Sequence, residues 1–550
     1  MRSGTSPHRE SVAIVGAGPG GLAAAVLLAA SGLRVTIYES RSAIGGRSGR
    51  LEVDGFSFDR GPTFFMMPYV LEEIISSATR SGRSDHADHA DHADHAVHGP
   101  SPRRTRLGDL VDLRRLDPMY RLVIGQPDRD PLRIDATQDL SRMARQFEAI
   151  SPGDGAGFLR FMADNRTKLR LMTPILRKPI TSLLDLMTLD GLKVAPKLKP
   201  WSSLYDHLRG YFSNESVRLA MSFQSKYLGM SPFECPSLFS ILPFIEYEYG
   251  IWHPIGGCHA LMQALAETAL SLGVEIRLDA PVTALKFDGR RIRGLCVDNT
   301  WHEHAHVIVN ADAAWALKNL VPESLRGRDT DKAIDARRYS CSTFMMYLGV
   351  RGEVDLPHHT IYTSASYREN LADISSRGRL SDDPSMYLCN PSRIDPTMAP
   401  AGMSSVYVLV PTPNTKAPID WPAETPRMRR AAYDQIERAL GVEGLEGRVV
   451  SETLFTPDDW RAMNINHGAT FNLAHNITQM LHWRPQHRLP GFDGLWLVGG
   501  GTHPGSGLPV IFLSSQITAE LVCREMGVPY AGARSVPPAA EMPAAAMAIG

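Results

Sequence analysis

Residues 11–47 read SVAIVGAGPGGLAAAVLLAASGLRVTIYESRSAIGGR: an apolar strand, a glycine-rich turn, an alanine- and leucine-rich helix, and a second strand that ends at an acid. This order predicts a βαβ unit whose helix N-terminus binds the pyrophosphate of a dinucleotide. Gly16 permits the tight turn, Gly18 lets the backbone approach the pyrophosphate, and Gly21 lets helix and strand pack closely. Glu39 can accept hydrogen bonds from the ribose hydroxyls of adenosine. The complete context favours a bound flavin dinucleotide over a βαβ unit without a ligand.

The composition is that of a globular protein. Of 550 residues, 43% are hydrophobic and 21% charged, and the formal net charge is −1, which gives no indication of nucleic-acid binding. Six cysteines form no CxxC pair, which predicts a reducing compartment and argues against a disulfide framework or a zinc site. Residues 1–10 hold no apolar signal core, and no apolar run reaches the ~18 to 20 residues that span a bilayer. We therefore expect a protein that is not integral to a membrane.

Two segments stand out from this background. Residues 81–106 contain Asp-His-Ala repeats, and composition favours a disordered His-rich insertion over a metal-binding tract. Residues 160–200 hold nine Lys and Arg against three Asp, with apolar residues interleaved. This second pattern is typical of basic amphipathic helices on an anionic lipid surface, and equally of a solvated basic face over a core. The sequence leaves both interpretations open.

A second glycine-rich loop closes the chain. Residues 494–510 read GLWLVGGGTHPGSGLPV, which predicts a strand, a loop and a helix that begins near Pro509. The helix N-terminus suits the pyrimidine end of a flavin, because reduction places negative charge there. Paired with the N-terminal unit, this loop predicts the other half of the same binding site.

Four segments of the sequence carry a resemblance to a known family. They are residues 11–47, residues 58–63 (FDRGPT), residues 252–257 (WHPIGG) and residues 501–509 (GTHPGSGLP). With them the chain resembles the phytoene desaturase-like carotenoid desaturases and oxidases, flavoproteins of the wider amine-oxidase-like group. The His-rich insertion is foreign to that pattern. The sequence of residues 508–513 also differs from the motif that is commonest among phytoene desaturases. This difference bears on the identity of the substrate more than on that of the cofactor.

The resemblance implies an α/β fold: a Rossmann-type FAD-binding domain, discontinuous in sequence, with an α+β substrate domain and a helical membrane-facing cap. We expect the FAD-binding domain in residues 1–80, 251–330 and 456–528. The substrate-binding and cap domain is expected in residues 107–250 and 331–455, with a disordered tail at residues 529–550. By position, the residues expected to bind FAD are Gly16, Gly18, Gly20, Gly21, Glu39, Ser40, Gly46, Arg47, Gly61, Pro62, Thr63, Val282, Gly500, Gly501, Leu508, Pro509, Val510 and Ile511.

A polyisoprenoid has no ionisable group, so its site must be a long apolar channel. The residues expected to line this channel are Phe64, Phe65, Tyr247 and Trp252. His503, beside the expected flavin ring, is the candidate catalytic base if it titrates near neutrality. Glu246 and Glu248 are expected to be surface carboxylates, and no metal site is expected.

The function expected from these features is FAD-dependent desaturation of a C40 or C30 carotenoid precursor such as phytoene or diapophytoene, with hydride passing to the flavin. The alternatives are a carotenoid isomerase, ketolase or terminal oxidase on the same scaffold, and a flavin-free prenyl-lipid escort of the GDP-dissociation-inhibitor type. We expect the protein in the cytoplasm, peripherally associated with the inner face of a membrane.

Overall fold

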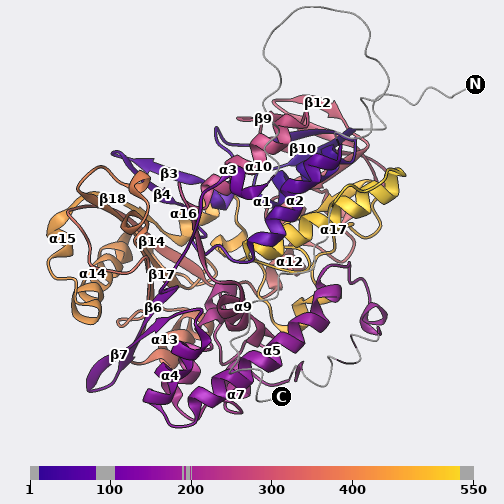
Figure 1. Cartoon of the computed structure of the whole chain (residues 1–550). Helices are drawn as coiled ribbons and strands as arrows, with labels where there is room; N and C mark the ends of the chain where they lie inside the picture. The colour runs from indigo at the N-terminus through magenta and orange to yellow at the C-terminus, as the bar shows by residue number, and fades with distance from the viewer. Residues whose placement is uncertain are drawn as a thin grey trace, which may run out of the picture.

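The computed structural model describes residues 11–81, 106–188, 191, 193, 198–199 and 201–532 (Figure 1). Nearly all of the predicted His-rich insertion, and the predicted tail from residue 533 onward, lie outside the described residues. The fold is mixed α/β, as expected, and contains two large sheets.

The first sheet has five parallel strands in the order β19-β13-β1-β2-β9. Their bounds are β1 Ser11–Val15, β2 Arg34–Tyr38, β9 Glu275–Arg277, β13 His306–Val309 and β19 Leu495–Leu497. The strand order reverses between β1 and β13, and ligands of such sheets bind at the carboxyl ends of the strands beside this reversal. The sheet is built from three distant parts of the chain, so any site at its edge combines them.

Alternate residues of β1 face two cores. Val12 and Ile14 pack against the helices α1 (Pro19–Ala30), α2 (Pro68–Ser81), α10 (His259–Ser271) and α17 (Leu508–Met526). Ala13 and Val15 pack against α11 (Ala313–Leu320) and a three-stranded sheet of β10 (Val282–Asp288), β11 (Arg291–Val297) and β12 (Thr300–Glu303). Helix α1 is buried from Gly20 to Ala30, which explains why its residues are apolar on every side. Its neighbour α17 comes from the other end of the chain (Figure 1).

The second sheet has seven strands in the order β18-β14-β17-β16-β15-β6-β7. Their bounds are β6 Tyr120–Gln126, β7 Arg129–Ala136, β14 Ser342–Arg351, β15 His359–Thr363, β16 Met386–Cys389, β17 Met403–Thr412 and β18 Val449–Phe455. All neighbours are antiparallel except β15 and β6. Helix α14 (Trp421–Leu440) covers the face that carries Phe344, Met346 and Leu348. The opposite face carries Met345 and Tyr347 and packs on the hairpin of β3 (Arg50–Val53) and β4 (Phe56–Asp59).

A group of helices packs against β6 and β7 around a third core. They are α4 (Leu140–Ile150), α5 (Asp154–Leu176), α7 (Leu204–Leu208), α8 (Glu215–Ala220) and α9 (Ile241–Tyr249), with the short 3-10 helix η4 (Phe223–Leu228). Within the described ranges, no helix combines the length and the apolar character needed to cross a bilayer.

Candidate active site

One cavity of about 740 Å³ is lined by residues of both large sheets. One end lies at the carboxyl ends of β1, β2 and β13, where Gly16, Glu39 and Asn310 contribute to its wall. Residues of β14, β15, β16 and β17 also line the cavity, together with η4. The residues expected to bind FAD, here called the dinucleotide-type residues, therefore line the same cavity as a second compartment of aromatic and aliphatic side chains.

The glycine turn is fitted around Asn310, a residue that the sequence analysis missed. Gly16 adopts φ +99°, and a Cβ there would lie 2.5 Å from the Asn310 carbonyl oxygen. Asn310 Nδ2 in turn donates to the Gly16 carbonyl oxygen at 3.0 Å. A Cβ on Gly21 would lie 2.2 Å from the same Gly16 oxygen, so Gly21 is required by packing. Asn310 thus joins β13 to the turn across the strand-order reversal.

Glu39 is held in place by backbone donors. Its Oε2 accepts from the Ala17 amide at 2.7 Å, and its Oε1 accepts from the Arg41 amide at 3.1 Å. The side chain is 5% exposed and lines the cavity. The Ser40 hydroxyl also donates to Oε1, at 3.3 Å. A carboxylate oxygen carries two lone pairs, so Oε2 retains capacity for a ribose hydroxyl.

Arg47 and the segment that it binds form another part of the cavity wall. The guanidinium donates to the Thr470 carbonyl oxygen at 2.8 Å and to Asn472 Oδ1 at 3.0 Å. Burial lowers the pKa of Arg47, and the nearby Asp312 opposes that shift. Arg47 therefore remains a cation facing the space beside Gly18 and Gly46, where an anionic pyrophosphate would neutralise it.

The closing loop reaches the cavity through the N-terminus of α17. Gly507, Leu508 and Ile511 line the wall, and a Cβ on Gly507 would meet no atom within 4 Å. Arg484, which is 1% exposed, holds this loop from behind by donating to the carbonyl oxygens of Thr502 and Gly500 at 3.1 and 2.8 Å. Buried Arg484 supports the loop without touching the cavity.

Most of the residues expected to bind FAD come together in this wall. Those that line the cavity are Gly16, Gly18, Glu39, Ser40, Gly46, Arg47, Gly61, Pro62, Thr63, Val282, Gly500, Leu508, Pro509 and Ile511. Gly20, Gly21, Gly501 and Val510 do not. Gly20 and Gly501 have packing roles instead, since a Cβ would lie 2.7 Å from Asn310 Oδ1 and 2.9 Å from Ala313 Cβ respectively.

These features fit an FAD molecule. The N-termini of α1 and α17 both open onto the cavity, and such termini bind anions through free N–H groups and the helix dipole. The buried hydroxyl of Thr470, in the same wall, has no partner among the described residues. Tyr407 Oη donates to the Gly61 carbonyl oxygen at 2.9 Å, which fixes the Gly61-Pro62-Thr63 segment against β17.

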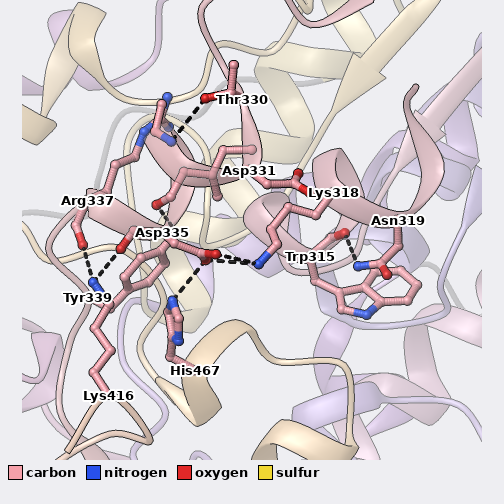
Figure 2. Close-up of polar contacts among 12 residues, drawn as sticks. Trp315, Lys318, Asn319, Thr330, Asp331, Asp335, Arg337, Tyr339, Lys416 and His467 are labelled. Carbon is pink, nitrogen blue, oxygen red and sulfur yellow. Dashed lines mark hydrogen bonds and ion pairs between the residues drawn. The ribbon is translucent and has the colours of Figure 1, made fainter. Parts of the chain in front are cut away.

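A polar cluster around Asp335 fixes another part of the wall (Figure 2). Asp335 accepts from Lys318 Nζ at 2.9 Å and lies 3.0 Å from His467 Nε2. Lys416 Nζ donates to the carbonyl oxygens of Asp335 and Arg337. The cluster ties α11 and α12 (Asp331–Ala336) to the 463–472 segment, whose Asn464 and Ile465 line the cavity.

The second compartment contains a hydrogen-bonded series of polar side chains. Tyr387 Oη, in the cavity wall, lies 2.6 Å from Thr63 Oγ1 and 2.7 Å from His359 Nδ1. His359 Nδ1 is also 3.3 Å from Nδ1 of His358. Burial holds the pKa of both imidazoles well below the usual range, so both are neutral. These residues, Thr63, Tyr387, His359 and His358, are called the Tyr387 series below. The series leads from the cavity into the protein interior.

His358, His359 and Cys389 also form a convergent set of possible metal ligands. Their donor atoms lie within 4.8 Å of one another, and all three residues are buried. Sequence spacing gave no sign of this set, because Cys389 comes from a neighbouring strand. Both Nδ1 atoms already take part in the hydrogen bonds of the Tyr387 series, which accounts for their close approach.

Of the residues expected to line a substrate channel, Phe64 lies in the wall. Its ring stacks on His359 with centroids 4.2 Å apart and lies 5.2 Å from the Tyr227 ring. Phe65, the next residue along the chain, points the other way into the core of the first sheet. Its carbonyl oxygen accepts from the Trp252 amide at 2.9 Å, and Trp252 packs on that same core. Tyr247 packs on Phe158 at 5.1 Å and is outside the wall.

His503 does not line the cavity either. It is 1% exposed, and its ring lies 6.0 Å from that of His487. Burial lowers the pKa of His503 to about 4. The expectation that it titrates near neutrality is therefore wrong, because the loop turns the imidazole into the protein and away from the cavity.

The expectation of two surface carboxylates is also wrong. Glu246 is fully buried on α9 and accepts from Tyr120 Oη at 3.0 Å and from Gln224 Nε2 at 2.9 Å. Burial raises the pKa of Glu246 to about 7 against these hydrogen bonds. Glu248 is 7% exposed and pairs with Arg166 at 2.5 Å. Helix α9 packs between other helices and exposes little surface to solvent. Its short sequence gave no indication of this burial.

Comparison with known proteins gives a consistent result. The family described as flavin containing amine oxidoreductase matches residues 19–523. A 4,4'-diapophytoene desaturase (4,4'-diapolycopene-forming) of Methylomonas sp. is 37% identical over 525 residues, which are 95% of this chain and 97% of that protein. An all-trans-zeta-carotene desaturase of Myxococcus xanthus is 37% identical over 539 residues, or 96% of each chain.

Solved structures show the same fold. The structure of cyclohexylamine oxidase from Brevibacterium oxydans IH-35A matches with a TM-score of 0.56 and 15% sequence identity, over 94% of this chain and 99% of that chain. At this identity the likeness concerns the fold alone.

Proposed function

The chain belongs to the flavin-containing amine oxidoreductase family and is an FAD-dependent oxidoreductase, and from this premise we propose that it desaturates a C40 or C30 carotenoid precursor such as phytoene or diapophytoene. One observation carries the proposal: a single cavity joins the dinucleotide-type residues at Gly16 and Glu39 to a compartment lined by Phe64, Met66 and Ile361. The reported relatives are desaturases, so the isomerase, ketolase, terminal oxidase and escort alternatives are not favoured.

The residues of the first compartment would hold FAD. Glu39 would bind the adenosine ribose, Arg47 and the N-terminus of α1 the pyrophosphate, and the N-terminus of α17 the flavin ring. When bound, FAD supplies the hydride acceptor for removal of hydrogen from a saturated carbon pair.

The other hydrogen of that carbon pair leaves as a proton, and the Tyr387 series is placed to take it. Tyr387 Oη would accept the proton while its own proton passes to His359 Nδ1. A neutral imidazole is a weak base when buried, but a carbon next to one that has lost hydride is strongly acidic. Phe64 would hold the polyene against this group and exclude water. Tyr387 thereby replaces His503 as the group we assign to proton transfer.

We also propose that the surface formed by residues 183–187 and Trp201 docks on the membrane that stores the substrate. Four large apolar side chains are exposed there: Leu183 at 56%, Leu184 at 73%, Met187 at 67% and Trp201 at 90%. Lys178, Lys193 and Lys199 are exposed nearby in the sequence and suit anionic lipids. Two basic residues of the 160–200 stretch face inward, since Lys168 binds Ser240 and Arg177 pairs with Glu73.

The test of the proposed activity is expression in a host that makes phytoene and in one that makes diapophytoene, with separation of the pigments formed. The proposal predicts products with additional conjugated double bonds in at least one host. Unchanged phytoene and diapophytoene, in the presence of FAD-loaded protein, would exclude it.

A further inference from the structure

The apolar compartment contains a cation that a hydrocarbon substrate does not need. Lys226, on η4, lines the cavity together with its neighbours Phe223 and Tyr227. Within the described residues, Nζ of Lys226 has neither an ion pair nor a hydrogen bond. It lies over the ring of Tyr367, 5.8 Å from the ring centroid.

This placement is energetically unfavourable without a ligand. An ammonium removed from water loses hydration that an aromatic ring replaces only in part. Burial lowers the pKa of Lys226 to about 8, and the Cys341 thiol opposes the shift slightly. The side chain therefore remains mostly protonated at neutral pH. Methionine would fill the same space without this penalty.

The acidic residues of the wall lie elsewhere. Glu39 is bound to the Ala17 amide, and Asp312 accepts from the Trp315 amide at 3.0 Å at the start of α11. Both stand beside the dinucleotide-type residues, and neither contributes to the pKa shift of Lys226. No counter-charge for this ammonium comes from the part of the wall that the structure describes.

A second unpartnered donor lies beside Lys226. Tyr367 is 5% exposed and lines the same compartment, and its hydroxyl has no hydrogen-bond partner in the described parts of the chain. An ammonium in the cavity wall and a buried phenol beside it, which share no acceptor, can together donate to an anion with oxygen atoms.

We propose that Lys226 and Tyr367 bind a carboxylate at the end of a polyene chain, so that the cavity accepts terminally oxidised polyenes. The inference rests on the proposed function, because it assumes that the compartment holds a polyene. The ligand class is an apocarotenoid-type acid: the chain occupies the apolar wall around Phe64 and Tyr227, and the carboxylate receives hydrogen bonds from the ammonium and the phenol.

The test is a binding titration of FAD-loaded full-length protein with retinoic acid and with methyl retinoate, its uncharged counterpart. We expect the wild-type protein to bind the acid about tenfold or more tightly than the ester. The variant Lys226→Met should bind the two equally, and Tyr367→Phe should lose part of the preference. Lys332→Met, which removes an exposed lysine on α12, is the matched control and should keep the full preference.

A pH series provides a second readout. The affinity for the acid should fall as pH rises above about 8, where free Lys226 loses its proton, and the ester should show no such change. The facing groups do not titrate in that range, because burial raises the pKa of Cys341 to about 11 and also raises the pKa of Tyr227 and Tyr367 above that of an ordinary phenol.

Equal affinities for acid and ester in the wild-type protein would overturn the inference. So would a Lys226→Met variant that keeps the preference but shifts the reduction potential of the flavin, since Lys226 would then serve the cofactor. The outcome is separable from that of the proposed function: pigment formation from phytoene or diapophytoene tests desaturation whether or not the acid binds. Because the acid and ester are compared on the wild-type protein, the test remains decisive even if a variant fails to fold.

Discussion

Tyr387 Oη lies 2.7 Å from Nδ1 of His359, and this contact connects a hydroxyl in the cavity wall to a buried neutral imidazole on the neighbouring strand. The two residues are 28 positions apart in the sequence and meet because β15 and β16 pair. We assign to this pair the removal of the proton that accompanies hydride loss.

Replacement of Tyr387 by phenylalanine should slow substrate-dependent flavin reduction by about 100-fold, because general acid–base groups contribute on that scale. His359→Phe should have a similar effect while it keeps the stacking on Phe64. If the two act as one unit, the double variant should be little slower than either single variant. The measurement is the anaerobic rate of flavin reduction at saturating substrate.

Tyr362→Phe is the control for this experiment. Tyr362 also lines the cavity, but its hydroxyl bonds Asp383 at 3.2 Å. Its loss should leave the rate nearly unchanged. Equal losses in Tyr362→Phe and Tyr387→Phe, or additive losses in the double variant, would show that the Tyr387 series does not transfer the proton.

The glycine turn makes a prediction about cofactor binding. A Cβ on Gly18 would lie 3.1 Å from Asn310 Nδ2, a tight contact that a shift of this amide by a few tenths of an ångström would relieve, whereas a bound pyrophosphate would need the space that the side chain fills. Gly18→Val should fold and lose bound FAD, measured as the ratio of flavin to protein after gel filtration. Gly447→Val, at an exposed glycine whose Cβ would meet no atom within 4 Å, should retain the wild-type ratio. Stoichiometric flavin in Gly18→Val would contradict the assignment.

The buried carboxyl of Glu246 should make the free energy of unfolding depend on pH. Its pKa is raised to about 7 in the folded protein by burial, so between pH ~4.5 and ~7 the folded state binds a proton that the unfolded state has lost. Stability conferred by the protonated carboxyl is present at low pH and declines as pH rises through this window. Glu246→Gln, which is neutral at all pH values, should be the more stable protein above pH ~7, by at most about 3 kcal/mol.

Thermal unfolding from pH 5 to 8 measures this difference. Glu267→Gln, at an exposed position on α10, should track the wild-type curve throughout. A difference between Glu246→Gln and the wild-type protein that stays constant with pH would mean that Glu246 is ionised across the range.

The exposed apolar residues predict membrane binding. The double variant Leu184→Glu with Trp201→Ser places a charge and a small polar group at sites that are 73% and 90% exposed. Its free energy of unfolding should be nearly unchanged, while co-sedimentation with anionic vesicles should fall about tenfold or more. Trp301→Ser, which removes a tryptophan that is 47% exposed on the distant strand β12, should sediment like the wild-type protein. Equal sedimentation of all three proteins would place the lipid contact elsewhere.

The sequence predicted those parts of the site whose residues are close together in the chain. Gly16, Gly18 and Glu39 belong to one contiguous βαβ unit, and Leu508 to Ile511 form one helix start, so local pattern was sufficient. Asn310 lies 294 positions from the glycine it supports, and a single asparagine after a short strand carries no recognisable signal.

The second compartment depends on tertiary packing to a greater degree. Phe64 and Phe65 are adjacent and chemically equivalent, yet one lines the cavity and the other lies in a core. Glu246 was expected at the surface because carboxylates usually are, and only the helices around α9 bury it. Tyr387 and His359 meet because their strands pair, and the sequence around neither residue indicates this contact.

The most direct test of the central claim is anaerobic mixing of the FAD-loaded protein with phytoene or diapophytoene in vesicles. The account predicts that the flavin absorption band at ~450 nm bleaches while new polyene bands appear at longer wavelengths than those of the substrate. Bound flavin that stays oxidised with both substrates, in protein that sediments with the vesicles, would contradict it.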